Sequence, residues 1–213
     1  MQAHPASRAD DSRSLATRAA LIECAEALFA GHGIDGVSLR QIGQASGSAN
    51  SSVVAYHFGS KETLLRAVIG HRLPAIEARR GELLAAARTG GDEPGIAALV
   101  DILFRPFFEQ TDPDGRHSYA TFLAELHRAD LIGVRDALSA EFPITRGLVR
   151  AIEQAVPPGA AGRFRHRMLL ASTLVFAAIR NLDQAQPEPD EAAALFADAL
   201  LAACAVFVAA PPA

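Results

Sequence analysis

The sequence predicts an all-α protein in which a small helix-turn-helix unit precedes a larger helical domain. Three observations lead to this prediction. Apolar residues recur at helical spacing along most of the 213 residues, no stretch alternates as a half-buried strand would, and two short helix patterns flank a tight turn within the first 60 residues. About half of the residues are hydrophobic and about a fifth are charged, so the chain has enough apolar surface to form a core.

The first long helix is expected from Ser14 to His32, where Ile22, Ala25 and Phe29 share one face. Residues 1–13 are polar and contain a proline, so they are expected to form a flexible arm. The segment "GHGIDG" ends the helix, and its second glycine is the expected left-handed cap.

Two short helices should follow. Ser38 to Gln41 matches a capping box and predicts a helix over about Leu39–Ser46. After the break "SGSAN", Asn50 is expected to cap a second short helix over about Ser51–His57. The dipeptide "GS" ends that helix, and Ser60 should cap a longer one.

A helix-turn-helix unit binds DNA by placing its second short helix in the major groove. The segment "NSSVVAYHFGSK", residues 50–61, suits this role because it contains no acidic residue and several hydroxyl groups that hydrogen-bond to base edges and phosphates. The net charge of the chain is −4, but residues 1–80 hold nine basic and seven acidic side chains. The positive balance of this part has the sign expected of a surface that meets phosphates.

The remainder, from about Gly81, contains six further segments of helical periodicity and no convincing strand. Turn-forming separators, "TDPDG", "FPI", "PPGAAG" and "PEP", divide them. Pro74 should kink or break the helix in which it lies, and Pro106 indicates a local irregularity.

The stretches "LIECAEALFAGHGIDGVSLRQIGQASG" and "YHFGSKETLLRAVI" resemble the DNA-binding domain of the TetR family of transcriptional regulators, over about Thr17 to Ile69. The turn rich in Asn and Ser, with "YHFG" after it, is similar to one branch of that family. The chain differs from the usual pattern by one additional residue between Gly47 and Phe58, which moves Tyr56 about 100° around its helix. Which side chain makes the family's usual tyrosine–phosphate contact therefore stays open.

The resemblance implies a flexible N-terminal arm at 1–13, a helix-turn-helix DNA-binding domain at 14–60, and a helical effector-binding and dimerisation domain at 61–213. Ser38 also has a purely structural role as a cap, and Tyr56 has the alternative of packing against the first helix, whereas Phe58 is expected in the core. The residues expected to contact DNA are Ser38, Arg40, Asn50, Ser51, Ser52, Tyr56, His57 and Lys61.

Regulators of this family are similar in having a helical ligand domain, in which ligand entry separates the two DNA-binding heads of a dimer. Aromatic residues near Pro106 and in "SYATFLAELH" suit an apolar cavity with a few polar groups, although such a stripe more often forms core. The candidate pocket residues are Phe104, Phe107, Phe108, Tyr119, Phe122 and His127.

The last two helical segments carry apolar residues at steps of three and four, and on more faces than one buried side requires. Two such helices from each subunit would form a four-helix bundle, whereas the alternative is burial within one subunit. The residues expected at the dimer interface are Val175, Ile179, Leu182, Phe196, Leu200, Ala203 and Phe207.

The resemblance implies a ligand-responsive transcriptional regulator, most simply a repressor. It would bind a palindromic double-stranded DNA operator as a homodimer and be released by a small organic effector. The alternative is a helical regulator that acts through a protein partner without specific DNA binding. An enzyme is not expected, because there is no H-x-x-x-H pair, phosphate loop or dinucleotide fingerprint, and neither a metal nor another cofactor is expected.

The N-terminus has no apolar stretch typical of a secretory signal, and the uncharged run Ala199 to Ala213 is shorter than the roughly 20 residues that span a bilayer. The two cysteines, Cys24 and Cys204, lie in apolar helical patterns and imply no disulfide framework. The sequence therefore predicts a cytoplasmic protein without a membrane segment.

Overall fold

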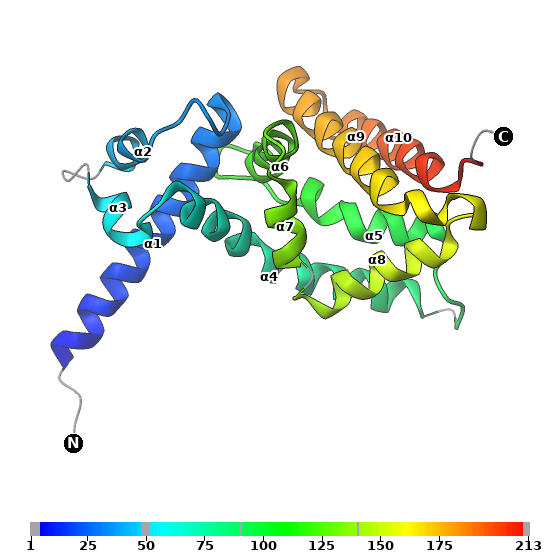
Figure 1. Ribbon diagram of the computed structural model, residues 1–213, viewed down its shortest axis with the longest axis horizontal. Helices are drawn as coiled ribbons and strands as arrows, with labels where there is room; N and C mark the ends of the chain where they lie inside the picture. The colour runs from blue at the N-terminus through cyan, green and yellow to red at the C-terminus, as the bar shows by residue number, and fades with distance from the viewer. Residues whose placement is uncertain (1–4, 48–51, 90, 140, 211–213) are drawn as a thin grey trace.

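The computed structural model describes residues 5–47, 52–89, 91–139 and 141–210, with side chains from Ser12 onward. In these ranges the chain forms ten α-helices and one short 3-10 helix, and no strand, which confirms the all-α prediction. The molecule is elongated: helices α2 and α3 lie at one end, and the paired helices α9 and α10 extend toward the other (Figure 1).

The first unit consists of α1 (Pro5–His32), α2 (Leu39–Ala45) and α3 (Val53–Phe58). Helix α1 begins at Pro5 and not at Ser14 as expected, so residues 5–13 continue the first helix. Proline is favourable in the first turn of a helix because it has no amide hydrogen to satisfy, and no further proline or glycine follows before Gly31. Gly33 has φ +74° after the end of α1, which confirms it as the left-handed cap.

Apolar side chains from all three helices, and from the start of α4, meet in one core. Because α2 and α3 together have only 13 residues, neither would be stable without this packing. The following side chains are at most 5% exposed: Ile22, Phe29, Ile34, Ile42, Val54, Phe58 and Leu64.

Helix α4 (Lys61–Ala87) joins this unit to the second domain and contacts α1 and α3 near its beginning and α5, α7 and α8 further on. The prediction that Pro74 would kink or break a helix was wrong about a break, since α4 continues through it. Pro74 is exposed, so the carbonyl that loses its helical donor there lies close to solvent.

The second domain contains α5 (Ile96–Glu109), α6 (Ser118–Arg128), α7 (Ile132–Ser139), α8 (Pro143–Ala155), the 3-10 helix η1 (Pro158–Arg163), α9 (Phe164–Ala185) and α10 (Pro189–Val208). Helix α9 packs against α6 and α10, and α5 packs against α4, α8 and α10. Phe107 and Phe176 meet edge to face, with ring centroids 5.1 Å apart, at the centre of this arrangement.

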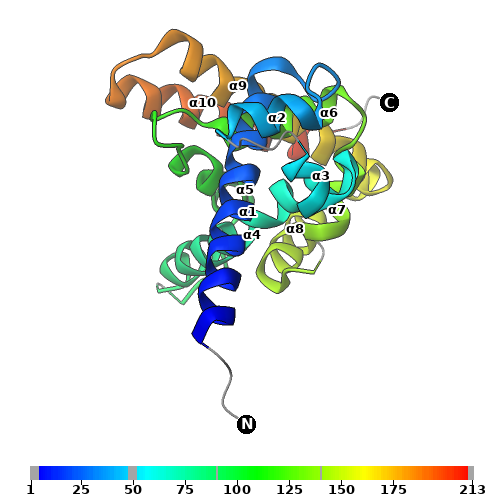
Figure 2. The same cartoon turned by 90° about the vertical axis from the view of Figure 1, so that its left-hand side faces the viewer.

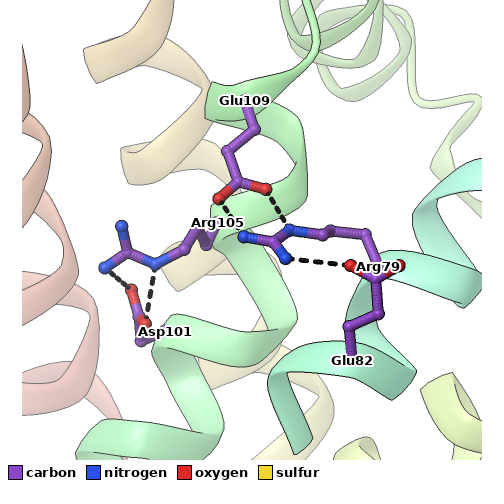
Figure 3. A network of polar contacts seen from close by, with 5 residues as sticks. All are labelled: Arg79, Glu82, Asp101, Arg105 and Glu109. Atoms are coloured by element: carbon purple, nitrogen blue, oxygen red, sulfur yellow. Dashed lines mark hydrogen bonds and ion pairs between the residues drawn. The ribbon is translucent and has the colours of Figure 1, made fainter. Parts of the chain in front are cut away.

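Ion pairs on the outside bind α5 to α4 (Figure 3). The Arg79 guanidinium donates to both carboxylate oxygens of Glu109, at 2.7 and 2.8 Å, and to Glu82 at 2.9 Å. On α5 itself, Arg105 binds Asp101 one turn away. The hydrogen bond from Arg79 holds the pKa of Glu109 below its usual range. Because these side chains are partly exposed to solvent, they fix the register of the two helices more than they stabilise the fold.

Candidate nucleic-acid interface and ligand cavity

Helix α2 begins with the predicted capping box. The Ser38 hydroxyl oxygen accepts from the backbone amide of Gln41 at 3.3 Å, and the Ser38 amide donates to the Gln41 side chain at 2.8 Å. Ser38 therefore has a structural role that needs no DNA. Arg40, in the first turn, is exposed. Both residues lie on the outside of the unit, where a phosphate can reach them.

Helix α3 begins two residues later than expected. Its N-cap is Ser52, not Asn50, and the Ser52 side chain makes no capping hydrogen bond to the helix amides. Ser52 is exposed, whereas Asn50 and Ser51 lie outside the described residues. The sequence-based boundary was wrong because a serine-rich turn contains several residues that are suitable caps, and hydrogen-bonding capacity alone does not select among them.

The two sides of α3 differ sharply. Val54 and Phe58 are buried and fix the helix to the core, so the prediction for Phe58 is confirmed. Tyr56 is on the opposite side with 84% of its surface exposed, and it does not pack against α1. The His57 ring is half-buried and meets Tyr56 edge to face at 5.2 Å between centroids. Figure 2 shows α2 and α3 facing outward, without cover from the second domain.

Helix α4 starts at Lys61, the only lysine of the chain, directly after the α3–α4 turn. Ser60 caps this helix, as predicted, by accepting from the Thr63 amide at 3.1 Å. The Lys61 ammonium lies 5.7 Å from the centre of the Phe29 ring. An ammonium beside the first amides of a long helix is a favourable place for a phosphate.

Arg18 is a basic neighbour that the sequence reading did not select. Its guanidinium lies 4.9 Å above the Phe58 ring, so a cation from α1 stands next to the end of α3. The side chain is exposed and remains available to solvent. Its proximity to α3 depends on how α1 crosses the unit, and no local pattern in the sequence encodes that crossing.

The second domain contains a cavity of about 800 Å³ between α4, α5, α6, α7, α8 and the start of α9. Its size is that of sites for small organic molecules. Of the six predicted pocket residues, Phe104, Phe107, Tyr119 and His127 line it. Phe122 and Phe108 do not, and for these two the prediction was wrong.

The two excluded aromatic residues pack elsewhere. Phe122 is fully buried against Phe29 of α1, with ring centroids 6.0 Å apart, and so belongs to the contact between the two domains. Phe108 is sandwiched between His117 and Phe196, with centroids at 5.4 and 4.3 Å. Aromatic spacing along a helix predicts which side chains are buried but does not say which of them border empty space.

The polar groups of the cavity come from separate helices. Arg80 of α4 is buried and donates to the Leu103 carbonyl and to the Thr145 hydroxyl, the latter at 2.7 Å. Burial lowers the pKa of Arg80 to about 9, assisted by the charge of Arg135 from α7. Burial likewise lowers the pKa of His127 to about 4, again with Arg135 contributing. Sequence reasoning missed Arg80 and Arg135 because residues 55 positions apart carried no common motif.

The cavity wall is connected to the helix-turn-helix unit through buried hydrogen bonds. Tyr119 of α6 donates to the Ile69 carbonyl of α4 at 3.2 Å. Its neighbour Ser118 donates to Glu26 of α1 at 2.6 Å. Glu26 is 1% exposed and accepts two bonds of 2.9 Å from Arg72 of α4. A displacement of α6 therefore acts directly on both α1 and α4.

The predicted dimer residues lie on the wrong side of α9 and α10. They pack the two helices against each other and against the rest of the chain, so they are unavailable to a partner. For these seven residues the alternative of burial within one subunit is the correct one, because both helices are apolar on more than one face and periodicity does not say which face meets the core. All of them are at most 9% exposed: Val175, Ile179, Leu182, Phe196, Leu200, Ala203 and Phe207.

A different apolar surface lies on the outside of the same helices. Leu170 of α9 is 46% exposed, and Leu195, Leu201 and Val208 of α10 are 44%, 66% and 43% exposed. Among the described residues, α10 is the one helix with the length and composition to cross a membrane. Because α10 is packed along one side on α9 and α5, its outer side presents a stripe of apolar residues on a folded domain.

Residues 21–68 match the family described as bacterial regulatory proteins, tetR family. No curated protein matches the chain. Among solved structures, a protein from Shewanella sp. PV-4 assigned to the tetR family of transcription regulators is similar, with 16% identity and a TM-score of 0.55 over 87% of this chain and 97% of that one.

Two further structures have lower scores. A Mesorhizobium loti protein, also assigned to that family, has 16% identity and a TM-score of 0.49 over 92% of this chain and 98% of that one. The protein RolR, crystallised with resorcinol, has 17% identity and a TM-score of 0.46 over 95% and 98%. The Shewanella structure shows a shared fold along most of both chains. Residues 21–68 are thus similar to the bacterial regulatory proteins of the tetR family, and in the structure they belong to a helix-turn-helix unit that is followed by a helical C-terminal domain.

Proposed function

We propose that this protein is a ligand-responsive transcriptional regulator, a repressor that binds a palindromic operator as a homodimer and leaves it when a small organic effector enters the cavity. The observation that carries the DNA part is the outer side of α3, where Tyr56 is exposed, with Ser52 at the start of the helix and Lys61 just after its end, on a unit that matches the tetR family. The match supports DNA binding, and the exposed residues supply groups suited to bases and phosphates.

Each residue of this surface has a proposed role. Ser52, at the first turn of α3, would meet base edges in the major groove, and Tyr56 would reach a phosphate through its hydroxyl. Tyr56 would thereby make the phosphate contact of the family in spite of its shifted position. Lys61, Ser38 and Arg40 would bind the phosphate backbone of the DNA on either side of the major groove.

The outer apolar stripe of α9 and α10 supports the homodimer. Two copies that join along this stripe would form a four-helix bundle and bring two recognition helices onto one face of the DNA. A two-fold symmetric protein reads a near-palindrome with half-sites about 34–36 Å apart or a multiple of that distance. A partner subunit, and not a membrane, would then cover the apolar stripe.

The effector would act through the hydrogen bonds that connect α6 to α1 and α4. A molecule that fits the cavity only when Tyr119 and Ser118 are displaced would favour a different orientation of the DNA-binding unit. It would shift the population only as far as its affinities for the two arrangements differ.

The first experiment is selection of bound duplexes from a random DNA pool, with the enriched sequence retested at two salt concentrations. Enrichment of a palindrome, with affinity falling as salt rises, is expected. The variant Lys61→Ala should weaken binding to all sequences alike and reduce the salt slope by about one unit, whereas Arg150→Ala, on the outside of α8, should not. A folded dimer that enriches no duplex, including after unfolding and refolding to remove any captive ligand, would instead support a regulator that acts through a protein partner.

A further inference from the structure

Two buried polar atoms at the cavity have no hydrogen-bond partner within the described part of the chain. They are Nε2 of His127, on α6, and Nε of Arg135, on α7. Both side chains border the cavity and both lie against Phe176, with the His127 ring at 5.6 Å and the Arg135 guanidinium carbon at 5.9 Å from its centroid. Unpaired buried groups of this kind are rare in folded proteins, and we expect them to form hydrogen bonds to a molecule in the cavity.

The hydrogen bonds of His127 determine which kind of atom Nε2 offers. The Thr173 hydroxyl donates its single hydrogen to the Leu169 carbonyl at 2.8 Å, so it is the acceptor in its 2.9 Å contact with Nδ1 of His127. Nδ1 therefore carries the proton. Because His127 is neutral at pH 7, Nε2 has none and is an acceptor. The cavity thus presents one unused acceptor at His127 and one unused donor at Arg135.

The charge around the cavity is positive. Its wall contains five arginines and two aspartates. One aspartate, Asp136, pairs with Arg135 from the neighbouring position and is half in solvent. Within the described residues, Arg80 forms no ion pair with a carboxylate and is connected to Glu77 through the Thr145 hydroxyl, which donates to that carboxylate at 2.6 Å. An anion in the cavity would offset this surplus, and a cation would add to it.

The rest of the wall is apolar or aromatic. Leu103, Phe104 and Phe107 come from α5, Val149 from α8 and Met168 from α9. A flexible methionine beside aromatic rings accommodates flat or elongated hydrocarbon groups. The first turn of α9, a helix of 22 residues, also borders the cavity, so the positive end of its helix dipole adds to the positive potential.

We propose that the effector is an organic acid with an apolar body, whose carboxylate binds Arg135 and whose hydroxyl or N–H group donates to His127. This inference rests on the proposed function, because it specifies the ligand of the same cavity. An arginine suits a carboxylate better than any other side chain does, since its planar fork matches the two oxygens. The apolar body would fill the part of the cavity bordered by α5 and α8.

The test is calorimetric titration of the full-length protein, without DNA, with 2-naphthoate, its neutral amide 2-naphthamide, and 2-naphthoates that carry a hydroxyl group on the second ring. We expect the carboxylate to bind about 10- to 100-fold more tightly than the amide. In Arg135→Met this preference should vanish because the carboxylate loses affinity. In the matched control Arg150→Met, which removes an exposed arginine away from the cavity, the preference should stay as in the wild type.

The titrations with hydroxylated 2-naphthoates test His127 separately. At least one hydroxy acid should bind more tightly than the parent acid to the wild type, and this gain should be absent from His127→Phe. Equal binding of acid and amide by the wild-type protein, or no binding of any of these compounds at millimolar concentration, would overturn the proposal whether or not the variants fold. So would an unchanged carboxylate affinity in Arg135→Met. None of these results bears on operator selection, which tests the proposed function without a ligand.

Discussion

The two tyrosines of the chain occupy opposite environments, and each predicts a different effect of losing its hydroxyl. Tyr56 exposes 84% of its surface on α3, whereas Tyr119 is 2% exposed and donates to the Ile69 carbonyl. Burial raises the pKa of Tyr119, which therefore stays protonated and keeps its donor. The Tyr56 hydroxyl, by contrast, is available only to solvent or to a ligand such as a phosphate.

Tyr56→Phe should change the free energy of unfolding by less than about 0.5 kcal/mol, because an exposed hydroxyl contributes little to the fold. It should weaken operator binding about 10-fold if the hydroxyl donates to a phosphate. Tyr119→Phe is the matched control and should cost about 1 kcal/mol of stability through the lost buried hydrogen bond. Urea unfolding and DNA titration of both variants would check this. Undiminished operator affinity in Tyr56→Phe would remove Tyr56 from the DNA-binding surface.

His127 predicts a pH dependence of stability. Its pKa is lowered from 6.5 to about 4 in the folded protein, first by burial and then by Arg135. Between these values the unfolded chain binds a proton that the folded chain does not, so the contribution of His127 to stability is present above pH 6.5 and is lost as the pH falls toward 4. Compared with His127→Phe, the wild type should lose on the order of 1–2 kcal/mol more over this range, with solvent screening considered. The free energy of unfolding of both proteins would be measured at several pH values between 7 and 4. The same dependence on pH in the two proteins would contradict this prediction.

At the scale of elements, the docking of α1 against α4 and α6 depends on one buried carboxylate. Glu26 binds Arg72 of α4 through both oxygens and accepts from Ser118 of α6. These hydrogen bonds hold α1, α4 and α6 in one arrangement, whereas apolar contacts alone would allow the helices to slide along one another. A buried charge whose partner is removed is costly, because the remaining ion is left without compensation.

Glu26→Gln should therefore destabilise the protein by about 3 kcal/mol, since it leaves the Arg72 charge largely unpaired. The matched control is Glu23→Gln, one turn earlier on α1, where the carboxylate is 58% exposed and lies 3.8 Å from His71. That change should cost less than about 0.5 kcal/mol. Thermal and urea unfolding would compare the two variants. Equal stabilities would mean that Glu26 does not carry the docking of these helices.

At the scale of the whole molecule, the outer stripe of α9 and α10 makes a prediction about assembly. Leu201 is 66% exposed on α10, and Leu15 is 68% exposed on α1, so the two leucines are matched in exposure. Leu201→Glu should convert a dimer into a monomer without unfolding it, because a carboxylate would be buried in an apolar interface. Leu15→Glu should leave association unchanged. Sedimentation of both variants would check this, and a monomeric wild type or a dimeric Leu201→Glu variant would contradict the proposed interface.

The sequence by itself determined the helices and the helix-turn-helix unit, because local signals encode them. The capping box of α2, the glycine after α1 and the apolar spacing of Val54 and Phe58 each act within a few residues. The start of α1 was misjudged because a polar helix that projects from the domain has no apolar pattern to mark it. The start of α3 was misjudged because its turn offers several suitable caps.

Only the tertiary structure decided which apolar faces are internal and where space remains. The periodicity of α9 and α10 predicts burial but is the same for a core face and a subunit face, so Val175 and Phe207 were placed at an interface although they lie inside one subunit. The cavity, likewise, brings Arg80, His127 and Arg135 together from three helices. Their proximity follows from how the helices cross, and this depends on contacts between residues far apart in the chain.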